Sequence, residues 1–251
     1  MRKPLVAGNW KMNGSIEISI DLIQGISSGQ WDSVETLVCP PFTLLSSVRH
    51  SIGDSGVKLG AQDVDSHPSG AFTGQISASM LVEQGCEYVI VGHSERRALF
   101  GESEREVGLK AQAALSAGLT PIVCLGESQD EREAGTTFDV VRRQLAAVID
   151  ETQGNRLSSI VVAYEPVWAI GTGLTATPEQ AQEVHALIRQ QLRDLDETEG
   201  DATRIVYGGS MKPDNAPNLM AQPDIDGGLV GGASLDADSF RAICLAADQM
   251  N

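Results

Sequence analysis

Lys11, His93 and Glu165 are spaced far apart in the chain, but each follows a short apolar run and together they could move a proton. A carboxylate at the mouth of an apolar strand, as Glu165 would be, is partly desolvated, which raises its pKa toward that of a useful base. His93 begins a segment typical of a helix start, where the imidazolium form is disfavoured. A neutral imidazole can donate a hydrogen bond to a carbonyl oxygen, and Lys11 could stabilise an oxyanion or a phosphate.

Each of these three residues, taken alone, has a more ordinary explanation. A glutamate at a strand end commonly caps a helix or forms an ion pair, a buried histidine commonly packs in the core, and a lysine is commonly solvated. Glu95 is expected to hold Lys11 in an ion pair. The chemical hypothesis therefore rests on the combination of residues.

Two glycine pairs predict a pocket for an anion. One pair precedes Ser210, and the other is Gly231-Gly232. Glycines let backbone N–H groups approach a phosphate, and a following helix N-terminus adds a favourable dipole. The second pair is expected to open the last helix. A single glycine pair usually marks only a tight turn, so the prediction depends on finding both.

A long connection directly follows Glu165. Its first part, Pro166-Val167-Trp168, is stiff, and its middle is small and pliable. A lid with two hinges needs this order of parts. We expect residues 166–176 to exclude water and to bring the N–H of Gly171 to the anion.

The elements that must position these residues alternate between strand and helix along the whole chain. Several of the apolar runs lack alternation, which is typical of parallel strands covered on both faces. The expected strands are Pro4–Asn9, Val34–Cys39, Val57–Gln62, Tyr88–Gly92, Thr120–Leu125, Ser159–Tyr164, Arg204–Gly208 and Gly227–Gly231. Their number and spacing predict an α/β fold in which residues 1–251 form one (β/α)₈ barrel domain, with eight parallel strands ringed by helices. An open doubly wound sheet is the alternative.

In such a barrel, the residues at the carboxyl ends of the strands line the active site. Polar residues and glycines concentrate at those ends: Asn9, Lys11, Gln62, His93, Ser94, Glu95, Glu127, Glu165, Ser210, Gly231 and Gly232. Cys124 also ends a strand, and packing is favoured over a direct role for it. A fold shaped by stability alone would not gather polar residues in this way.

Composition narrows the partners and the compartment. The formal net charge is −16, from 18 Lys and Arg against 34 Asp and Glu. No basic cluster suits a nucleic acid or an anionic membrane surface. No apolar run approaches a membrane span, and the N-terminal run is too short for a signal peptide. The four cysteines have no metal-site spacing. We therefore expect a cytoplasmic protein that binds neither nucleic acid nor membrane.

The segment Asp63–Ser77 is too long for an ordinary loop and carries Ala71 and Phe72 near its tip. Long loops inside compact domains are usually functional. The loop could fold back on its own barrel or could pack against a partner subunit.

Five motifs in this order carry a family resemblance: NWKMNG at 9–14, VGHSERR at 91–97, AYEPVWAIGTG at 163–173, YGGS at 207–210 and VGGASL at 230–235. The chain resembles the triosephosphate isomerase family over its whole length. The resemblance implies a homodimeric barrel of glycolysis and gluconeogenesis that interconverts dihydroxyacetone phosphate and D-glyceraldehyde 3-phosphate without a cofactor or metal.

The resemblance also implies roles for residues. Glu165 would be the base, His93 the neutral electrophile, and Lys11 with Asn9 the stabilisers of the enediolate. The phosphate would be held by Gly171, Ser210, Gly231 and Gly232. The loop 63–77 would dock into the other subunit, with Thr73 near that subunit's Lys11 and His93. Glu95 would support the site from behind, and whether Cys124 supports it or only packs stays open.

Two residues depart from the family pattern. Leu174 stands where the family commonly has lysine, which bears on the rate of lid movement, and Gln75 replaces a glutamate at the expected interface.

Two other functions compete with the isomerase. They are a Schiff-base lyase with Lys11 as nucleophile and a non-catalytic phosphate-binding barrel.

The implied substrate is an anion, so the bulk charge of −16 cannot attract it. Only 5 of the 18 cations are lysines. Lys11 is expected to be the one lysine at the catalytic mouth, so the attraction must come from Lys11 and nearby backbone N–H groups.

Overall fold

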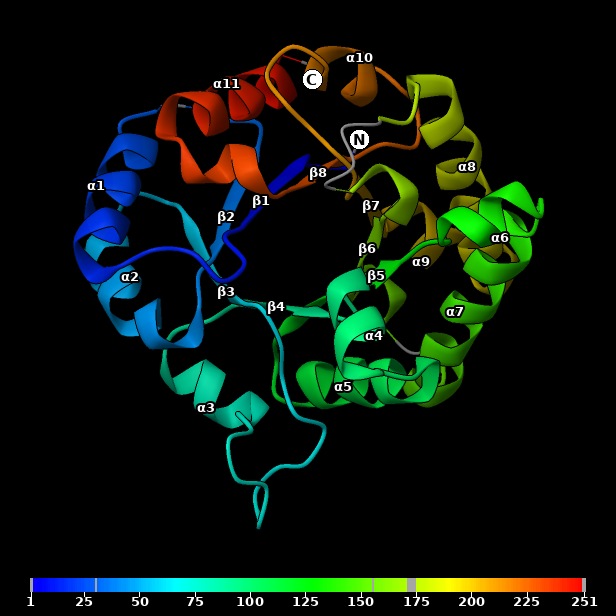
Figure 1. Cartoon of the computed structure of the whole chain (residues 1–251), viewed down its shortest axis with the longest axis horizontal. Coiled ribbons are helices and arrows are strands. Elements are labelled where there is room, and N and C mark those ends of the chain that lie inside the picture. The colour runs from blue at the N-terminus through cyan, green and yellow to red at the C-terminus, as the bar shows by residue number, and fades with distance from the viewer. Residues whose placement is uncertain (1, 30, 155, 171–174, 250–251) are drawn as a thin grey trace.

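Eight parallel strands close into a barrel in the computed structural model, which describes residues 2–29, 31–154, 156–170 and 175–249. Each strand pairs with the next, and the last pairs with the first (Figure 1). The strands are β1 Leu5–Asn9, β2 Glu35–Cys39, β3 Lys58–Ala61, β4 Tyr88–Val91, β5 Thr120–Leu125, β6 Val161–Tyr164, β7 Arg204–Tyr207 and β8 Gly227–Val230. The predicted barrel is confirmed, and the expected strands differ from these by at most two residues at either end.

The strands are apolar on both faces because each face has its own core. Alternate side chains point inward and fill the barrel as a cluster of twelve: Leu5, Ala7, Leu37, Cys39, Tyr88, Ile90, Ile122, Cys124, Val161, Ala163, Val206 and Leu229. The outward side chains pack in a larger cluster with the surrounding helices. A barrel filled in this way is a packed core, so ligands can reach only its ends.

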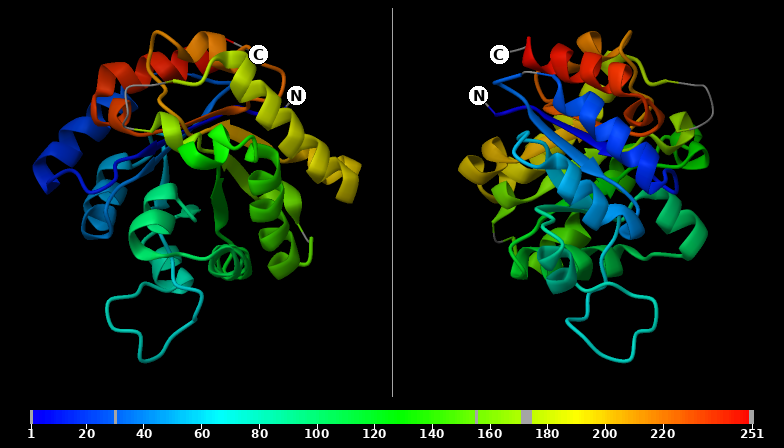
Figure 2. Two further views of the ribbon diagram at one scale, coloured as in Figure 1. Left: turned by 45° about the vertical axis from the view of Figure 1, so that its right-hand side comes forward. Right: turned by 90° about the vertical axis from the view of Figure 1, so that its left-hand side faces the viewer.

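Helices surround the barrel in every view (Figures 1 and 2). The α-helices are α1 Ile16–Ser27, α2 Leu45–Ile52, α3 Ala78–Glu83, α4 Ser94–Phe100, α5 Glu104–Ser116, α6 Gln129–Glu133, α7 Thr137–Thr152, α8 Pro178–Leu195, α9 Glu197–Ala202, α10 Ala216–Met220 and α11 Ala237–Asp248. Short 3₁₀ turns are η1 Phe42–Leu44, η2 Leu157–Ser159, η3 Val167–Ala169 and η4 Gly232–Leu235. None of the helices within the described residues is long and apolar enough to cross a membrane.

Helix α8 illustrates how local sequence begins an element. Thr177 is its N-cap, Pro178 stands at the first position, and Gln180 completes a capping box. The buried stripe includes Val184 and Ile188. Leu195, the last residue of the helix, is exposed.

The loop 63–77 protrudes from the barrel and does not fold back on it (Figures 1 and 2). Its base is held by an ion pair of 2.7 Å between Asp63 and Lys110 and by a β-bridge between Asp65 and Ser77. Residues 67–75 are exposed, and the Phe72 ring stacks on the ring of His67. The alternative in which this loop packs on its own barrel is wrong.

His185 makes the stability of the fold depend on pH. Its ring on α8 is fully buried, lies edge-on to Tyr164 and donates from Nδ1 to the carbonyl of Asp224 at 3.0 Å. Burial, only partly offset by Asp224, lowers the pKa of His185 from 6.5 to about 4. The unfolded chain therefore binds more protons between these two pH values, so this part of the stability is complete above pH 6.5 and is lost as the pH falls.

We expect the free energy of unfolding to fall by up to about 3 kcal/mol between pH 6.5 and pH 4 on account of His185 alone. His185→Gln keeps a donor for Asp224 but cannot titrate, so urea unfolding of this variant should show a flatter pH dependence. His50→Gln, which removes an exposed imidazole on α2, is the matched control. Equal flattening in the two variants would contradict the assignment.

Candidate active site

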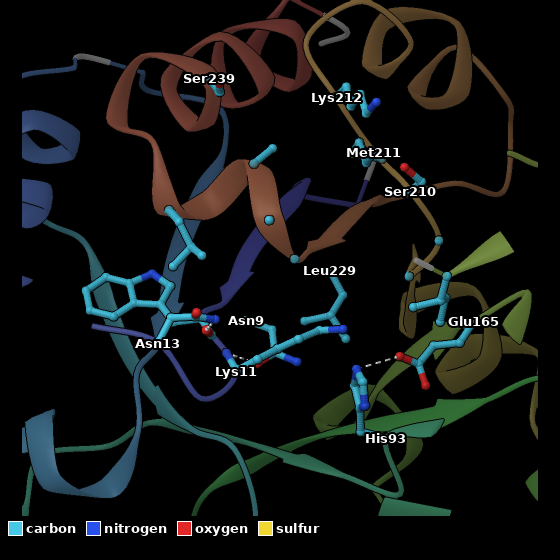
Figure 3. Close-up of a pocket in the computed structure, with 18 of the residues that line it drawn as sticks. Asn9, Lys11, Asn13, His93, Glu165, Ser210, Met211, Lys212, Leu229 and Ser239 are labelled. Carbon is cyan, nitrogen blue, oxygen red and sulfur yellow. Dashed lines mark hydrogen bonds and ion pairs between the residues drawn. The ribbon is translucent and has the colours of Figure 1, made fainter. Parts of the chain in front are cut away.

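A cavity of about 580 Å³ opens at the carboxyl ends of the strands (Figure 3). It gathers seven of the predicted site residues from five strand ends: Asn9, Lys11, His93, Glu165, Ser210, Gly231 and Gly232. Gly171 and Leu174 lie outside the described residues. The structure thus brings these seven residues together, whereas Gln62, Ser94, Glu95 and Glu127 do not line this cavity.

Glu165 is held by its backbone between two neighbouring strands. Its N–H donates to the carbonyl of Leu125 at 2.7 Å, and the N–H of Gly208 donates to the carbonyl of the preceding Tyr164 at 2.7 Å. A Cβ atom at position 208 would come within 2.8 Å of the Glu165 Cγ. Gly208 is therefore needed to leave room for the Glu165 side chain, a role that the sequence analysis missed.

The Glu165 carboxylate faces the start of α4. The backbone N–H of Ser94 donates to its Oε2 at 2.8 Å, and its Oε1 lies 3.0 Å from Nε2 of His93. Figure 3 shows the two side chains pointing toward each other across the cavity floor. Glu165 is only 1% exposed, so both contacts act with little screening by water.

His93 is the N-cap of α4, which confirms the predicted helix start. Its Nδ1 accepts a hydrogen bond from the N–H of Glu95 at 3.2 Å. A nitrogen that accepts cannot carry a proton, so the neutral ring holds its proton on Nε2, the atom that faces the cavity. His93 is thus oriented to donate from Nε2.

The pKa values of Glu165 and His93 are coupled. Burial by itself raises the pKa of Glu165, but His93 and the Ser94 N–H outweigh it, so the pKa lies below the usual value. Burial by itself lowers the pKa of His93, but the Glu165 carboxylate outweighs it, so that pKa is raised. The expectation of a raised pKa for Glu165 is therefore wrong for this arrangement, because it counted desolvation and not the neighbouring donors.

Lys11 lies opposite this pair in a strained backbone conformation. Its φ is +52°, in the left-handed region that residues other than glycine rarely adopt. The Asn9 side chain accepts from the Lys11 N–H at 3.0 Å, and Gln62 donates to the Lys11 carbonyl at 2.8 Å. Nζ forms the predicted ion pair with Glu95 at 2.6 Å. The surrounding structure thus fixes this lysine at the cavity against the backbone preference.

The glycine pair after β8 offers bare backbone to the cavity. A Cβ atom on Gly232 would meet no atom within 4 Å, and one on Gly231 would meet only the Lys11 side chain at 3.7 Å. Gly232 begins the 3₁₀ turn η4, and α11 starts later, at Ala237. The expectation that this pair opens the last helix is corrected: a short turn stands between them.

The remaining predicted residues lie behind the cavity or away from it. Cys124 is fully buried in the barrel interior, where burial and the nearby Glu165 raise the pKa of its thiol. Glu127 is also fully buried and accepts from Trp168 Nε1 at 2.9 Å, so it anchors the chain after Glu165. Thr73 is exposed on the protruding loop, away from this chain's own cavity.

Arg97 is a supporting residue that the sequence analysis did not single out. It donates to the carbonyls of Gly92 at 2.8 Å and Cys124 at 3.0 Å, so it ties the segment before His93 to β5. In the sequence, its place in the motif VGHSERR was the signal that could have pointed to this supporting role.

This arrangement suits removal of a proton next to a carbonyl group. A carboxylate that stays ionised, a histidine that donates from Nε2 and a lysine can together take a proton from carbon and stabilise charge on oxygen. The bare backbone near Ser210 and Gly232 suits an anion at the other end of the same molecule. Within the described residues, no group of three or more His, Cys, Asp or Glu could hold a metal ion.

Comparisons with known proteins point in one direction. The family model described as triosephosphate isomerase matches residues 4–247. The triosephosphate isomerase of Thiobacillus denitrificans is 57% identical over 247 residues, which cover 98% of this chain and 99% of the relative. That of Dechloromonas aromatica is 54% identical, covering 99% and 100%. That of Halorhodospira halophila is 56% identical, covering 98% and 99%.

Proposed function

The chain belongs to the triosephosphate isomerase family, and on this premise we propose that it interconverts dihydroxyacetone phosphate and D-glyceraldehyde 3-phosphate. It is then an intramolecular aldose–ketose isomerase of glycolysis and gluconeogenesis that needs no cofactor. The observation that carries the proposal is the pairing of Glu165 with His93 at 3.0 Å in a cavity whose opposite end is bare backbone.

In the proposed mechanism, Glu165 takes the proton from one substrate carbon and returns it to the next. His93 donates from Nε2 to the substrate oxygens, and Lys11 with Asn9 stabilises the negative charge of the enediolate. Triosephosphate isomerase is itself the usual illustration of a glutamate base paired with a neutral histidine, so this assignment is inherited from the family. The contact in which Nδ1 of His93 accepts from the Glu95 N–H supports donation from Nε2.

The phosphate does not react, but it anchors the substrate at Ser210, Gly231 and Gly232, and through Gly171 in the lid. Its binding energy can drive the lid, residues 166–176, over the cavity. The enediolate would lose phosphate in water, so an enclosed site protects it. Triosephosphate isomerase is also the usual example of such a lid.

We propose that the enzyme works as a homodimer in the cytoplasm, through the loop 63–77. Exposed apolar side chains support this: Phe72 on the loop, Met80 on α3 directly after it, Leu99 and Phe100 at the end of α4, and Met12 after β1. Thr73 would then lie near Lys11 and His93 of the other subunit and complete the site. Nucleic acid and membrane are not proposed as partners, since the net charge is −16.

Gln75 should make this dimer less sensitive to salt than a glutamate would. Gln75 is exposed on the loop, so Gln75→Glu adds a charge at the proposed interface. We expect the dissociation constant of the Gln75→Glu dimer, measured by analytical ultracentrifugation, to vary more steeply with salt. Gln112→Glu, an exposed site on α5, is the control. Identical salt slopes for the unmodified chain and both variants would count against the interface.

A coupled assay with D-glyceraldehyde 3-phosphate, in which only the coupling enzyme is supplied with a cofactor, tests the activity directly. Formation of dihydroxyacetone phosphate supports the isomerase. Borohydride trapping of Lys11 with substrate would instead indicate the Schiff-base lyase. Binding of phosphate without turnover would indicate a non-catalytic barrel.

A further inference from the structure

The cavity carries a second lysine that the sequence analysis did not place there. Lys212 lines the cavity two residues after Ser210, between β7 and α10. Figure 3 shows its side chain at the rim, next to Met211 and Ser210. The expectation that Lys11 is the one lysine at this mouth is therefore wrong, because Lys212 reaches the cavity from further along the loop that follows β7.

Two lysines line the cavity, Lys11 and Lys212, and within the described residues only Lys11 is paired with a carboxylate. Lys11 already has Glu95 at 2.6 Å, and Lys58 and Lys110 pair with carboxylates elsewhere. Lys212 is exposed and forms no ion pair with any carboxylate of the described residues. It is thus a cation without a paired carboxylate at the active-site rim of a chain with a net charge of −16.

One side chain fixes Lys212 relative to the anion end of the cavity. The Lys212 N–H donates to Oδ1 of Asn215 at 2.8 Å, and Nδ2 of the same residue donates to the Ser210 carbonyl at 2.9 Å. Pro213 restricts the backbone between them. The Lys212 backbone is therefore held in register with Ser210.

We propose that Lys212 is the residue that captures the phosphate dianion and steers it to Ser210 and Gly232. This inference rests on the proposed function and adds a residue that acts on substrate association. An ammonium group and a dianion attract each other over roughly one Debye length, about 10 Å at 0.1 M ionic strength. Charges that line a cleft raise the association rate of a charged substrate in this way, and salt weakens the effect. Lys212 would locally oppose the repulsion by the acidic surface.

Three substitutions test the inference: Lys212→Met, Lys212→Arg and Lys58→Met. Lys58 begins β3, at the opposite end of the barrel, so its loss changes the net charge equally without touching the site. At low ionic strength we expect Lys212→Met to reduce kcat/KM for glyceraldehyde 3-phosphate about threefold to tenfold, with the difference closing at high salt. Lys212→Arg should restore kcat/KM, and Lys58→Met should leave it unchanged.

The inhibition constant of inorganic phosphate should rise with Lys212→Met by a similar factor. Equal effects of Lys212→Met and Lys58→Met, or a deficit that does not change with salt, would overturn the inference while leaving the isomerase activity intact. If the unmodified chain does not isomerise the substrate, the proposed function fails. In that case, calorimetric titration of the two variants with inorganic phosphate still decides whether Lys212 attracts the anion.

Discussion

Replacing Glu165 with Gln should reduce turnover of glyceraldehyde 3-phosphate by about 10²- to 10⁴-fold, the usual contribution of a positioned base. The amide has nearly the same shape as the carboxylate and can still accept from the Ser94 N–H, but it cannot take a proton. Inorganic phosphate should bind as before, because the anion end is built from the segments after β7 and β8. Steady-state kinetics and phosphate inhibition measure the two effects separately.

The position of the carboxylate matters as well as its presence. Glu165→Asp keeps the charge but withdraws it by about one methylene, and a displacement near 1 Å can cost about 10²-fold. Glu183→Gln makes the Glu-to-Gln change at an exposed site on α8 and is the control for Glu165→Gln. Near-normal turnover of Glu165→Gln would reject the assignment of the base, whatever the behaviour of the other variants.

The same substitution should change the titration of His93. The Glu165 carboxylate raises the pKa of His93 against the effect of burial, so its removal should lower that pKa. The imidazole resonances of His93 in NMR titrations of the unmodified chain and Glu165→Gln measure the difference. An unchanged pKa would mean that the contact of 3.0 Å is not maintained in solution.

The sequence predicted the barrel because its signals are local. Each strand is a short apolar run, α8 begins at its own capping box, and the polar residues stand directly after the strands that carry them. The order of parallel strands then brings Lys11, His93 and Glu165 together without any knowledge of distances.

What the sequence could not predict depends on contacts between separate segments. The room that Gly208 leaves for Glu165 and the tie from Arg97 to β5 exist only once neighbouring strands are in register. The lowered pKa of Glu165 has the same origin, because it results from His93 and Ser94, which lie about 70 residues away in the chain. Lys212 was missed because it reaches the cavity from within a loop.

Lys11→Met should reduce turnover by about 10³-fold or more, since even one neutral oxyanion donor is typically worth 10²- to 10³-fold. Its left-handed backbone supports a dedicated role: such strain costs about 1–3 kcal/mol and persists only where the surrounding structure holds it. Here Asn9 and Gln62 hold it from both sides. The loss should appear mainly in kcat, whereas Lys212→Met acts on substrate association.

Lys58→Met separates the local field of Lys11 from the charge of the whole chain. Lys11→Met and Lys58→Met each make the net charge of −16 more negative by one, so an attraction that depended on bulk charge would weaken equally in the two variants. We expect full turnover for Lys58→Met, measured with glyceraldehyde 3-phosphate across a range of salt. Comparable losses in the two variants would mean that the charge of the acidic surface, and not that of the cavity, governs the attraction of the substrate.

The two lysines differ in location far more than in local pairing. Nζ of Lys11 lies 2.6 Å from Glu95, and Nζ of Lys58 lies 2.8 Å from Glu87. A difference in turnover between them therefore reports the position of the charge in the cavity.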